Sequence, residues 1–539
     1  MCGVVGYIGP KAVEYITKAL KALQYRGYDS HGTAFLLDKE ISVNKGLGPV
    51  KDDYADSLNH IVSTCGIGHV RWATHGKVTL INAHPHLSDN LALVHNGIVK
   101  NTNELKLDKS YISDTDTEVL AHWLANDGSL SEVEGDFAVL FIRGQCLFAA
   151  CRNIPLYFAR HNDCIMVASS MNVFDDLFEK YECASLESDV LYQVNDLPFL
   201  DWQEYKGTIN SLAVSTTFEE IREQKNFDFT PRSDCKLQLN KKRKLILYGC
   251  GSSYHAASVA QYFFRRCRFE NVEVYIPDEL KNFYFHSQDA QYIAISQSGE
   301  TKDMLDVTRF LKNKKASVIA ITNGRNSTLE KLADKTINLN CGVEKGVAAT
   351  KTYTATLFAL LNIAFDGDVQ VDLKNKINEI FEAYYPNIPR HFLENLHNVY
   401  LFGSGIVHRA NREGALKLKE MAMLHAEAIY TSEVKHGPLV LLNEQASSIF
   451  VVDGQKCDYI LDNIHQVRSR GGKVLVLANK NFHLDGMKDC DIIHIPESDD
   501  LFVEVFLITI YWQIVAWEIG NSKGVNIDRP VNLAKCVTV

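Results

Sequence analysis

The pattern of hydrophobic and polar positions divides the chain into three stretches. Residues 1 to about 207 consist of short apolar runs separated by polar, glycine-containing segments, which predicts many β-strands. Residues 208–242 are polar with few large apolar side chains, and this predicts a linker that carries one short helix. Beyond this linker, short apolar runs alternate with helical segments, the pattern of doubly wound parallel sheets.

An internal repeat indicates two similar α/β domains in the last of these stretches. KLILYGCGSSYHA at 244–256 and NVYLFGSGIVHRA at 398–410 each combine a strand, a G-x-G turn and the start of a helix. A second apolar strand follows each copy, at 291–296 and at 447–454. A strand-turn-helix unit that recurs in this way predicts tandem domains.

The longest apolar stretch covers residues 501–520. It is long enough to cross a membrane, but it contains Glu504, Gln513 and Glu518, which favours a buried core helix. The N-terminus lacks the basic region and apolar run of a signal peptide. We therefore expect a cytoplasmic protein that is not bound to a membrane.

Composition and charge narrow the class of protein. With 539 residues the chain is too long for one core, and its 46% hydrophobic and 23% charged residues are ordinary for a soluble protein. The net charge of -10 comes without a long run of one sign, so nucleic-acid binding is not expected. Thirteen cysteines without a C-x-x-C pair indicate reduced thiols rather than a disulfide framework or a zinc ribbon.

The strand-to-helix turns are candidates for ligand binding. A dinucleotide fingerprint needs a third glycine where the two repeats have Tyr254 and His408, which argues against a nicotinamide or flavin site. SQSGET at 296–301 lies between an apolar strand and a helical segment, where backbone N–H groups and hydroxyls can hold one phosphate. The alternative is a helix N-cap with additional hydroxyl groups.

Ionisable residues in the second repeat suggest proton transfer. Glu413, Lys417 and Glu420 are spaced to share one helical face, and by spacing alone a solvent-exposed ion-pair ladder is the favoured interpretation. The alternative is acid–base chemistry on a sugar, together with His436, which Gly437 and Pro438 place in a rigid turn. Lys535, alone in an apolar tail, could form a Schiff base.

The first stretch contains histidine-rich motifs and an unusual N-terminus. Metal binding is not indicated, because the residues concerned lack ligand spacing: His69, His75, His84, His86 and His95. Asn96–Gly97 is either a hairpin turn or an oxyanion hole. Cys2, directly behind Met1, is either a small buried residue or a nucleophile that requires removal of the methionine.

Together these motifs resemble the glutamine–fructose-6-phosphate aminotransferase (isomerising) family over almost the whole chain. MCGVVGYIG, LQYRGYDSHG, RWATHG, HNGI and TDTEV are similar to its N-terminal-nucleophile (Ntn) glutaminase domain. GCGSSYHA, SQSGET, GVAATK, EGALKLKE, HAEA, EVKHGP and RPVNLAKCVTV are similar to its two sugar-isomerase (SIS) domains and C-terminal tail. The resemblance implies an αββα glutaminase domain at 2–207, a linker at 208–238, α/β SIS domains with doubly wound parallel sheets at 239–375 and 390–531, and a tail at 532–539.

The resemblance also implies roles in glutamine hydrolysis. Cys2 would attack the glutamine amide with its own α-amine as the base, and Asn96 and Gly97 would form the oxyanion hole. Trp72 matches the residue that gates an internal ammonia channel, and Arg26 matches a structural arginine near the nucleophile. The residues expected to bind glutamine are Arg71, Trp72, Thr74, His75, Asp116 and Arg26.

The same resemblance implies roles in sugar chemistry. His436 would open the ring of fructose 6-phosphate, Lys535 would form an imine with the ketone, and Glu420 would move a proton between C1 and C2. Lys417 would assist and Glu413 would position it. The residues expected to bind the sugar phosphate are Ser252, Ser253, Ser296, Gln297, Ser298, Thr301, Val347, Ala348 and Lys351.

The implied partners are glutamine and fructose 6-phosphate, without a cofactor or metal, and the implied assembly is a homodimer with His436 contributed across the interface. Three positions differ from the family pattern: Ser252 replaces a threonine, Ala349 replaces a serine, and TTFEEI at 216–221 replaces H-Y-M-x-K-E-I. Ser252 keeps the hydroxyl group, Ala349 removes one possible hydrogen-bond donor, and the altered linker segment concerns signalling between domains rather than the chemistry. A feedback site for a nucleotide sugar is not expected.

Other functions fit the sequence less well. A phosphoribosyl-pyrophosphate amidotransferase needs an acidic pyrophosphate loop, of which VVDG at 451–454 is only a fragment, and asparagine synthetase needs an S-G-G-x-D-S loop that is missing. Another sugar phosphate could be the acceptor. A non-catalytic sugar-phosphate sensor is disfavoured, because every proposed catalytic position holds a competent residue.

Overall fold

The computed structural model describes residues 2–38, 40–73, 76–197, 200–206, 217–282, 289–389, 392, 396–452, 458–479, 490–498 and 500–536. The chain forms two compact units. The first comprises Met1–Ala213 together with the chain end from Ala534, and the second comprises Val214–Leu533.

The first unit contains two antiparallel sheets. In the described residues, an eight-stranded sheet has the order β13-β11-β9-β10-β1-β4-β2-β3, and a five-stranded sheet has the order β12-β8-β7-β6-β5. The strands are β1 Gly3–Ile8, β2 Ser30–Leu37, β3 Glu40–Leu47, β4 Cys65–Arg71, β5 His86–Ser88, β6 Leu91–Gly97, β7 Phe137–Arg143, β8 Cys146–Arg152, β9 Tyr157–His161, β10 Cys164–Ala168, β11 Lys180–Ser185, β12 Leu191–Gln193 and β13 Gln203–Lys206.

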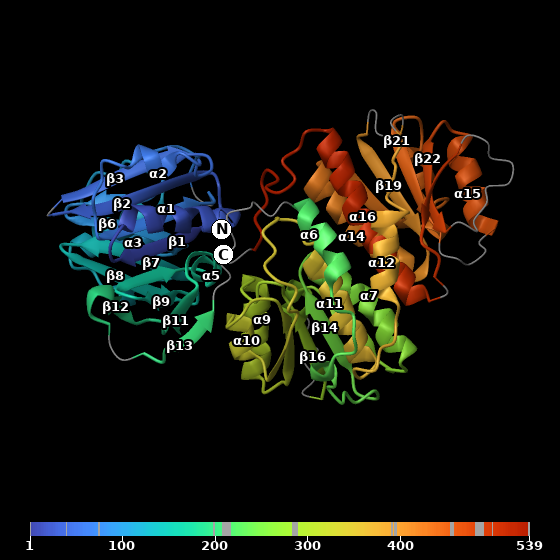
Figure 1. Ribbon diagram of the computed structural model, residues 1–539, viewed down its shortest axis with the longest axis horizontal. Coiled ribbons are helices and arrows are strands. Elements are labelled where there is room, and N and C mark those ends of the chain that lie inside the picture. Colours follow the sequence, from blue (N-terminus) through green and yellow to red (C-terminus); the bar gives the residue numbers. More distant parts are fainter. Residues whose placement is uncertain are drawn as a thin grey trace. The chain divides into compact units, whose positions relative to one another are not determined.

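Strand alternation divides the apolar side chains of this unit among three layers of core. Val4 packs between the two sheets, whereas its neighbour Val5 faces α1 (Ala12–Leu23), which covers the larger sheet together with α5 (Asn172–Leu177). On the other sheet, Leu93 faces α3 (Thr102–Leu105) and α4 (Asp116–Ala125). The resulting helix–sheet–sheet–helix arrangement confirms the predicted αββα architecture (Figure 1).

The second unit contains two five-stranded sheets, parallel throughout their described strands, in the orders β15-β14-β16-β17-β18 and β20-β19-β21-β22-β23. The strands are β14 Leu245–Gly249, β15 Val272–Tyr275, β16 Gln291–Ile295, β17 Val318–Thr322, β18 Lys335–Asn338, β19 Asn398–Gly403, β20 His425–Tyr430, β21 Ala446–Val451, β22 Lys473–Asn479 and β23 Asp491–Ile495. The predicted repeat is confirmed: β14 leads into α7 (Ser252–Arg266), and β19 leads into α14 (Gly405–Ala422).

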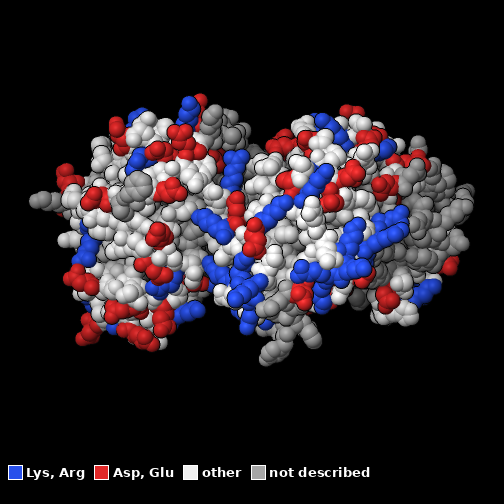
Figure 2. All heavy atoms as spheres, turned by 90° about the horizontal axis from the view of Figure 1, so that it is seen from below, with Lys and Arg blue, Asp and Glu red and all other residues white. Residues whose placement is uncertain are grey.

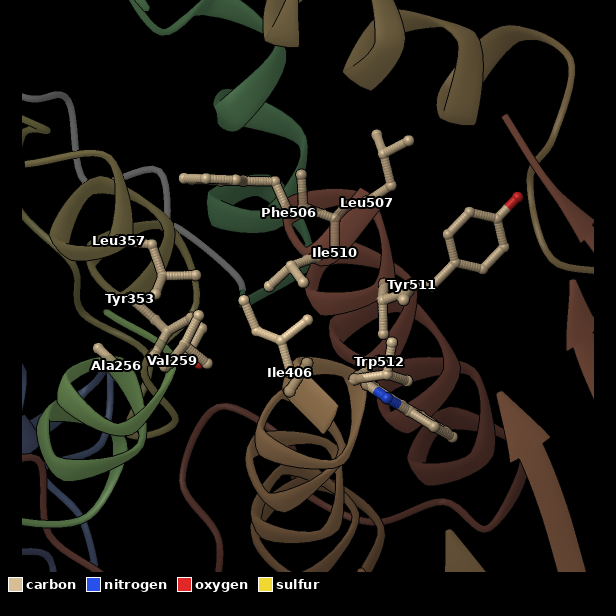
Figure 3. Close-up of a cluster of buried hydrophobic side chains, with 14 of the residues drawn as sticks. Ala256, Val259, Tyr353, Leu357, Ile406, Phe506, Leu507, Ile510, Tyr511 and Trp512 are labelled. Carbon is tan, nitrogen blue, oxygen red and sulfur yellow. The ribbon is translucent and has the colours of Figure 1, made fainter. Parts of the chain in front are cut away.

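One hydrophobic core joins both sheets of the second unit. Figure 3 shows its centre, where α7 and α14 meet α11 (Lys351–Ala364) and α16 (Leu501–Ser522). Ile510 and Trp512 of α16 are fully buried there. By length and composition α16 could cross a membrane, but most of it is buried in this core, which confirms the predicted core helix.

The outer faces of the two sheets have cores of their own. The first sheet is covered by α8 (Pro277–Asn282), α9 (Lys302–Asn313) and α10 (Thr328–Leu332), and the second by α15 (Asp458–Arg468). α12 (Leu373–Glu382) adds Leu373, Ile377 and Ile380 to the shared core. Helices on both faces explain why the inner strands β14, β16, β17, β19, β21 and β22 are mainly apolar.

The described part of the linker forms the short helix predicted for it, α6 (Thr217–Glu223), whereas its residues 208–216 lie outside the described residues. Acidic and basic side chains are both spread over the face drawn in Figure 2. This mixture agrees with the nearly balanced totals of 66 acidic and 56 basic residues in the chain.

Candidate active sites

Cys2 lies at the end of β1, beside the end of the neighbouring strand β4. The pairing of Gly3 with Val70 brings Cys2 next to Arg71 and Trp72. The Cys2 thiol donates a hydrogen bond to the Trp72 carbonyl oxygen at 3.5 Å. Gly27 permits the close packing of this segment, because a Cβ there would lie 2.6 Å from the Arg71 carbonyl carbon.

Charged groups surround the Cys2 thiol. Burial raises its pKa above the usual cysteine value, and the positive charges of the amino terminus and Arg71 only partly offset this effect. Asp116 is close enough to act electrostatically on both Cys2 and Arg71. The structure therefore brings together the Cys2 thiol, the Arg71 cation and the Asp116 carboxylate. Cys2 and Asp116 are 114 positions apart in the sequence.

Asn96 and Gly97 are the last residues of β6 and pair with Ala138 and Phe137 of β7. The hairpin-turn alternative is therefore wrong. Asn96 is buried, and its Nδ2 has no hydrogen-bond partner among the described residues. Gly97 has a φ of 147°, and a Cβ there would lie 2.2 Å from the Asp136 carbonyl oxygen. Only glycine fits this position.

The other residues expected in this site have defined supports. Asp116 opens α4, and its Oδ2 accepts a hydrogen bond from the Val99 backbone N–H at 2.9 Å. Arg26 is buried, and its Nη1 donates to the Ser169 carbonyl oxygen at 2.5 Å, a contact that suits a structural arginine. Thr74 and His75 lie outside the described residues.

Four buried histidines lie close together at β6, and one of them, His95, belongs to this strand. The rings of His69 and His84 stack with centroids 3.9 Å apart, and His86 meets His84 edge-on. His69 Nε2 lies 3.0 Å from the carbonyl oxygen of His95, directly before Asn96. Burial lowers the pKa of each of these histidines, to about 3 for His86, so all four are neutral at pH 7. Within the described residues, no group of three or more possible metal ligands is present.

In the second unit, the register of the first parallel sheet brings together the two turns that the sequence analysis considered for ligand binding. Gly249 of β14 pairs with Ile295 of β16, so the turns after both strands lie at the same sheet edge. In the turn after β16, Ser296 Oγ lies 3.2 Å from Thr301 Oγ1 and accepts a hydrogen bond from Gly299 N–H. Ser298 Oγ accepts from Glu300 N–H. The Gln297 carbonyl oxygen accepts from two backbone N–H groups of the next loop.

Glu413, Lys417 and Glu420 of α14 form a buried network, so the solvent-exposed ladder interpretation is wrong. The Lys417 ammonium is fully buried and lies 3.1 Å from Glu413 Oε1 and 2.5 Å from Glu420 Oε2. Burial would raise the pKa of Glu413, but Lys417 and the hydrogen bonds from His255 and Ser252 hold it below the usual value. The pKa of Lys417 is raised, because the two carboxylates outweigh the effect of its burial.

Ser252 and Ser253 open α7, at the same edge of the sheet. The Ser252 hydroxyl donates to Glu413 Oε1 at 2.8 Å, which connects the first SIS repeat to the network of the second. His255, which the sequence did not single out, lies 2.8 Å from Glu413 Oε2 through its Nδ1. The only sequence signal for His255 is its position one helical turn after the G-x-G motif.

The loop that carries Val347, Ala348 and Lys351 is held by the linker helix α6. The Lys351 ammonium, almost fully buried, lies 2.5 Å from Glu223 Oε2. Glu220 is buried and accepts hydrogen bonds from the backbone N–H groups of Lys345 and Gly346. Sequence reasoning did not identify either glutamate, because a polar linker gives no sign that its carboxylates are buried.

His436 and Lys535 do not belong to α14, the helix that carries the Glu413–Lys417–Glu420 network. His436 lies in the predicted turn, exposed, with its N–H donating to the Glu433 carbonyl oxygen at 2.9 Å. Lys535 is partly buried in the C-terminal tail, which groups with the first unit.

The described part of the second unit also has two pockets. One has a volume of about 470 Å³ and lies beside Glu223 and Arg232, and the other has a volume of about 440 Å³ and lies beside His408 and Tyr430.

Comparison with known proteins gives matches in both units. Residues 79–176 match the model of a glutamine amidotransferase domain, and residues 238–364 and 392–512 match that of the SIS domain. In solved structures, the C-terminal domain of glucosamine-fructose-6-phosphate aminotransferase from Francisella tularensis superposes with a TM-score of 0.50 at 26% identity, covering 58% of this chain and 98% of that one. Tagatose-6-phosphate ketose/aldose isomerase from Escherichia coli, at 19% identity and a TM-score of 0.51, shares the fold over 60% of this chain and 98% of its own.

Curated relatives match the chain over its whole length. The chain is 30% identical to glutamine–fructose-6-phosphate aminotransferase (isomerizing) of Helicobacter pylori and 32% identical to that of Pyrococcus horikoshii, and each match covers 100% of both chains. The chain therefore belongs to the glutamine–fructose-6-phosphate aminotransferase (isomerising) family.

Proposed function

We propose that this protein transfers the amide nitrogen of glutamine to fructose 6-phosphate and isomerises the product to glucosamine 6-phosphate, releasing glutamate. Residues 2–207 hydrolyse glutamine, the domains at 239–375 and 390–531 carry out the sugar chemistry, and residues 208–238 and 532–539 act as linker and tail. The observation that supports this proposal is that the turns after β14 and β16 lie at one sheet edge, where Ser252 donates a hydrogen bond to Glu413 of the Glu413–Lys417–Glu420 network.

Before glutamine can be hydrolysed, Met1 must be removed from the chain. This removal frees the α-amine of Cys2. The raised pKa of the thiol means that a base must take its proton, and the freed α-amine of Cys2 serves as that base. Arg71 binds the glutamine carboxylate and Asp116 binds its ammonium group. The unpaired Nδ2 of Asn96, together with the N–H of Gly97, stabilises the oxyanion. Trp72 covers the thiol and gates the passage of ammonia.

The sugar half uses the polar groups at the edge of the first parallel sheet. Ser296, Ser298 and Thr301 bind the phosphate at the start of α9, whose backbone N–H groups favour an anion. His436 opens the sugar ring, Lys535 forms the imine at C2, and Glu420 moves the proton between C1 and C2. Glu420 is the one carboxylate of its network that remains partly exposed, which suits a group that contacts substrate.

We also propose a cytoplasmic homodimer that supplies the first amino sugar for hexosamine synthesis. No disulfide joins the described cysteines, which suits a reducing compartment. His436 lies on an exposed turn followed by two exposed apolar side chains, Val440 and Leu441, and this surface suits contact with a second copy.

The function is tested by supplying glutamine and fructose 6-phosphate and measuring glucosamine 6-phosphate and glutamate. We expect Cys2→Ala to abolish glutamine hydrolysis while fructose 6-phosphate still binds. We expect Lys535→Ala to keep glutaminase activity and to lose sugar amination. Nitrogen transfer from glutamine by Cys2→Ala, or an intact mass that retains Met1 in the active enzyme, would contradict the assignment of the nucleophile.

A further inference from the structure

The Glu413 carboxylate is held from two different SIS repeats. Glu413 and Lys417 lie on α14, whereas two of the groups that bind Glu413, Ser252 and His255, lie on α7. Glu413 is 1% exposed, so every one of its hydrogen bonds must come from the protein. A buried carboxylate that loses one such bond retains its charge without compensation, which is costly.

Lys417 transmits the position of Glu413 to Glu420. An ammonium group has three N–H donors, and three oxygen atoms lie around Nζ: Glu413 Oε1 at 3.1 Å, Glu420 Oε2 at 2.5 Å and Ser252 Oγ at 3.3 Å. The ammonium is 0% exposed, so these partners alone fix its orientation. A rotation of the Glu413 carboxylate therefore moves Lys417 and, through it, the partly exposed Glu420.

His255 fixes this rotation. Its Nδ1 lies 2.8 Å from Glu413 Oε2, whereas Lys417 and Ser252 both bind the other oxygen, Oε1. Because a carboxylate oxygen only accepts, Nδ1 carries the hydrogen. Without this donor, Oε2 has no hydrogen-bond donor among the described residues to match the two at Oε1, and the carboxylate plane is no longer set.

We propose that His255 is a positioning residue for the sugar reaction, which orients Glu413 and thereby the Lys417–Glu420 pair. This inference rests on the proposed function, in which Glu420 moves a proton on the sugar. The His255 side chain is 14% exposed and acts through Glu413 rather than by contact with the substrate.

Two variants of nearly equal shape test this role. His255→Asn keeps an N–H donor near the position of Nδ1, and His255→Leu removes it. We expect His255→Leu to lower kcat for glucosamine 6-phosphate formation by about 10- to 100-fold, the range for loss of one hydrogen bond to a charged group, with KM for fructose 6-phosphate changed by less than about threefold. We expect His255→Asn to restore kcat to within about threefold of the unmodified enzyme. Glutamine hydrolysis should be unchanged in both variants.

A second measurement separates this inference from the proposed function. Exchange of the sugar C1 or C2 hydrogen with deuterated water, followed by NMR on glucosamine 6-phosphate, reports the action of Glu420 without nitrogen transfer. If the unmodified enzyme exchanges hydrogen but does not aminate fructose 6-phosphate, the proposed function fails and the two variants still test His255 by exchange. Full activity in His255→Leu, equal losses in both variants, or no exchange in the unmodified enzyme would overturn the role of His255.

Discussion

Close backbone contacts at single residues set the geometry of the glutamine site. The segment that carries Arg71 and Trp72 passes so near Gly27 that a side chain at position 27 would overlap the backbone at both residues. The Cys2 thiol in turn bonds to the Trp72 carbonyl oxygen. A glycine outside the proposed catalytic set therefore constrains the position of Arg71 and, through Trp72, of Cys2, the proposed carboxylate-binding residue and nucleophile.

Gly27→Ala should therefore impair glutamine use. A Cβ would lie 2.6 Å from the Arg71 carbonyl carbon and 2.7 Å from Trp72 N, and the backbone must move to accommodate it. A displacement of this kind typically costs activity without contact to the substrate, and we expect kcat/KM for glutamine to fall roughly 10- to 100-fold. Steady-state glutaminase assays provide the measurement.

Gly144→Ala is the matched control for this change. Gly144 lies in the β7–β8 turn with a φ of 60° and nothing within 4 Å of an added Cβ, so alanine strains only this turn and glutaminase activity should stay close to that of the unmodified protein. If Gly27→Ala is equally active, the close approach does not control the site.

At the scale of elements, neutral histidines join the two sheets of the first unit. His69 on β4 reaches the backbone of β6 at His95, and the His84 and His86 rings fill the space beside it. Their lowered pKa values mean that the folded unit binds fewer protons here than the unfolded chain does at acidic pH. The stability of this unit should therefore depend on pH.

We expect the free energy of unfolding of the first unit to fall as pH drops below about 6.5, the usual histidine pKa, and to keep falling toward about 3 for His86. Each histidine contributes up to about 1.4 kcal/mol per pH unit in this window, and nothing above it. Urea titrations at several values between about pH 7.5 and about pH 5.5 measure how steeply the free energy of unfolding changes with pH. Proteolysis of the first unit is the signal that reports its unfolding. His86→Asn should lower the slope by about one bound proton. An unchanged slope would show that His86 is protonated in the folded state.

At the scale of the whole chain, the second unit is built around one shared hydrophobic core although its sequence is a tandem repeat. α16 follows the last strand of the second sheet, yet its buried residues share one core with strands of both sheets. Trp512 packs on Gly414, where a Cβ would lie 2.5 Å from its ring, and its Nε1 donates to Asn411 Oδ1 at 2.9 Å.

Trp512→Ala should therefore destabilise both SIS repeats together, by about 3–5 kcal/mol, as expected for removing a large buried aromatic ring. Hydrogen exchange followed by mass spectrometry should show faster exchange in peptides from both β14 and β19. Trp123→Ala in the first unit is the control and should leave these peptides unchanged. Faster exchange confined to the β19 sheet would indicate two independent cores.

The sequence by itself determined the order of domains, the two strand-turn-helix repeats, the core helix at 501–520 and most candidate site residues. These features depend on local patterns: apolar periodicity, glycine turns and short motifs whose spacing is contiguous in the chain. The same patterns located the strand-to-helix turn at 296–301, the proposed phosphate site, because such a turn needs only one strand and one helix start.

Only the tertiary structure decided how separated residues are used. The spacing of Glu413, Lys417 and Glu420 is the same on a solvent face and in a core, and burial against α7 turned an apparent surface ladder into a fixed network. The sequence alone allows Asn96–Gly97 to be a turn, and only the pairing of these residues with β7 shows that they belong to a strand. His255, Glu220 and Glu223 gain their roles from partners 125 to 158 residues away, and no local pattern encodes such contacts.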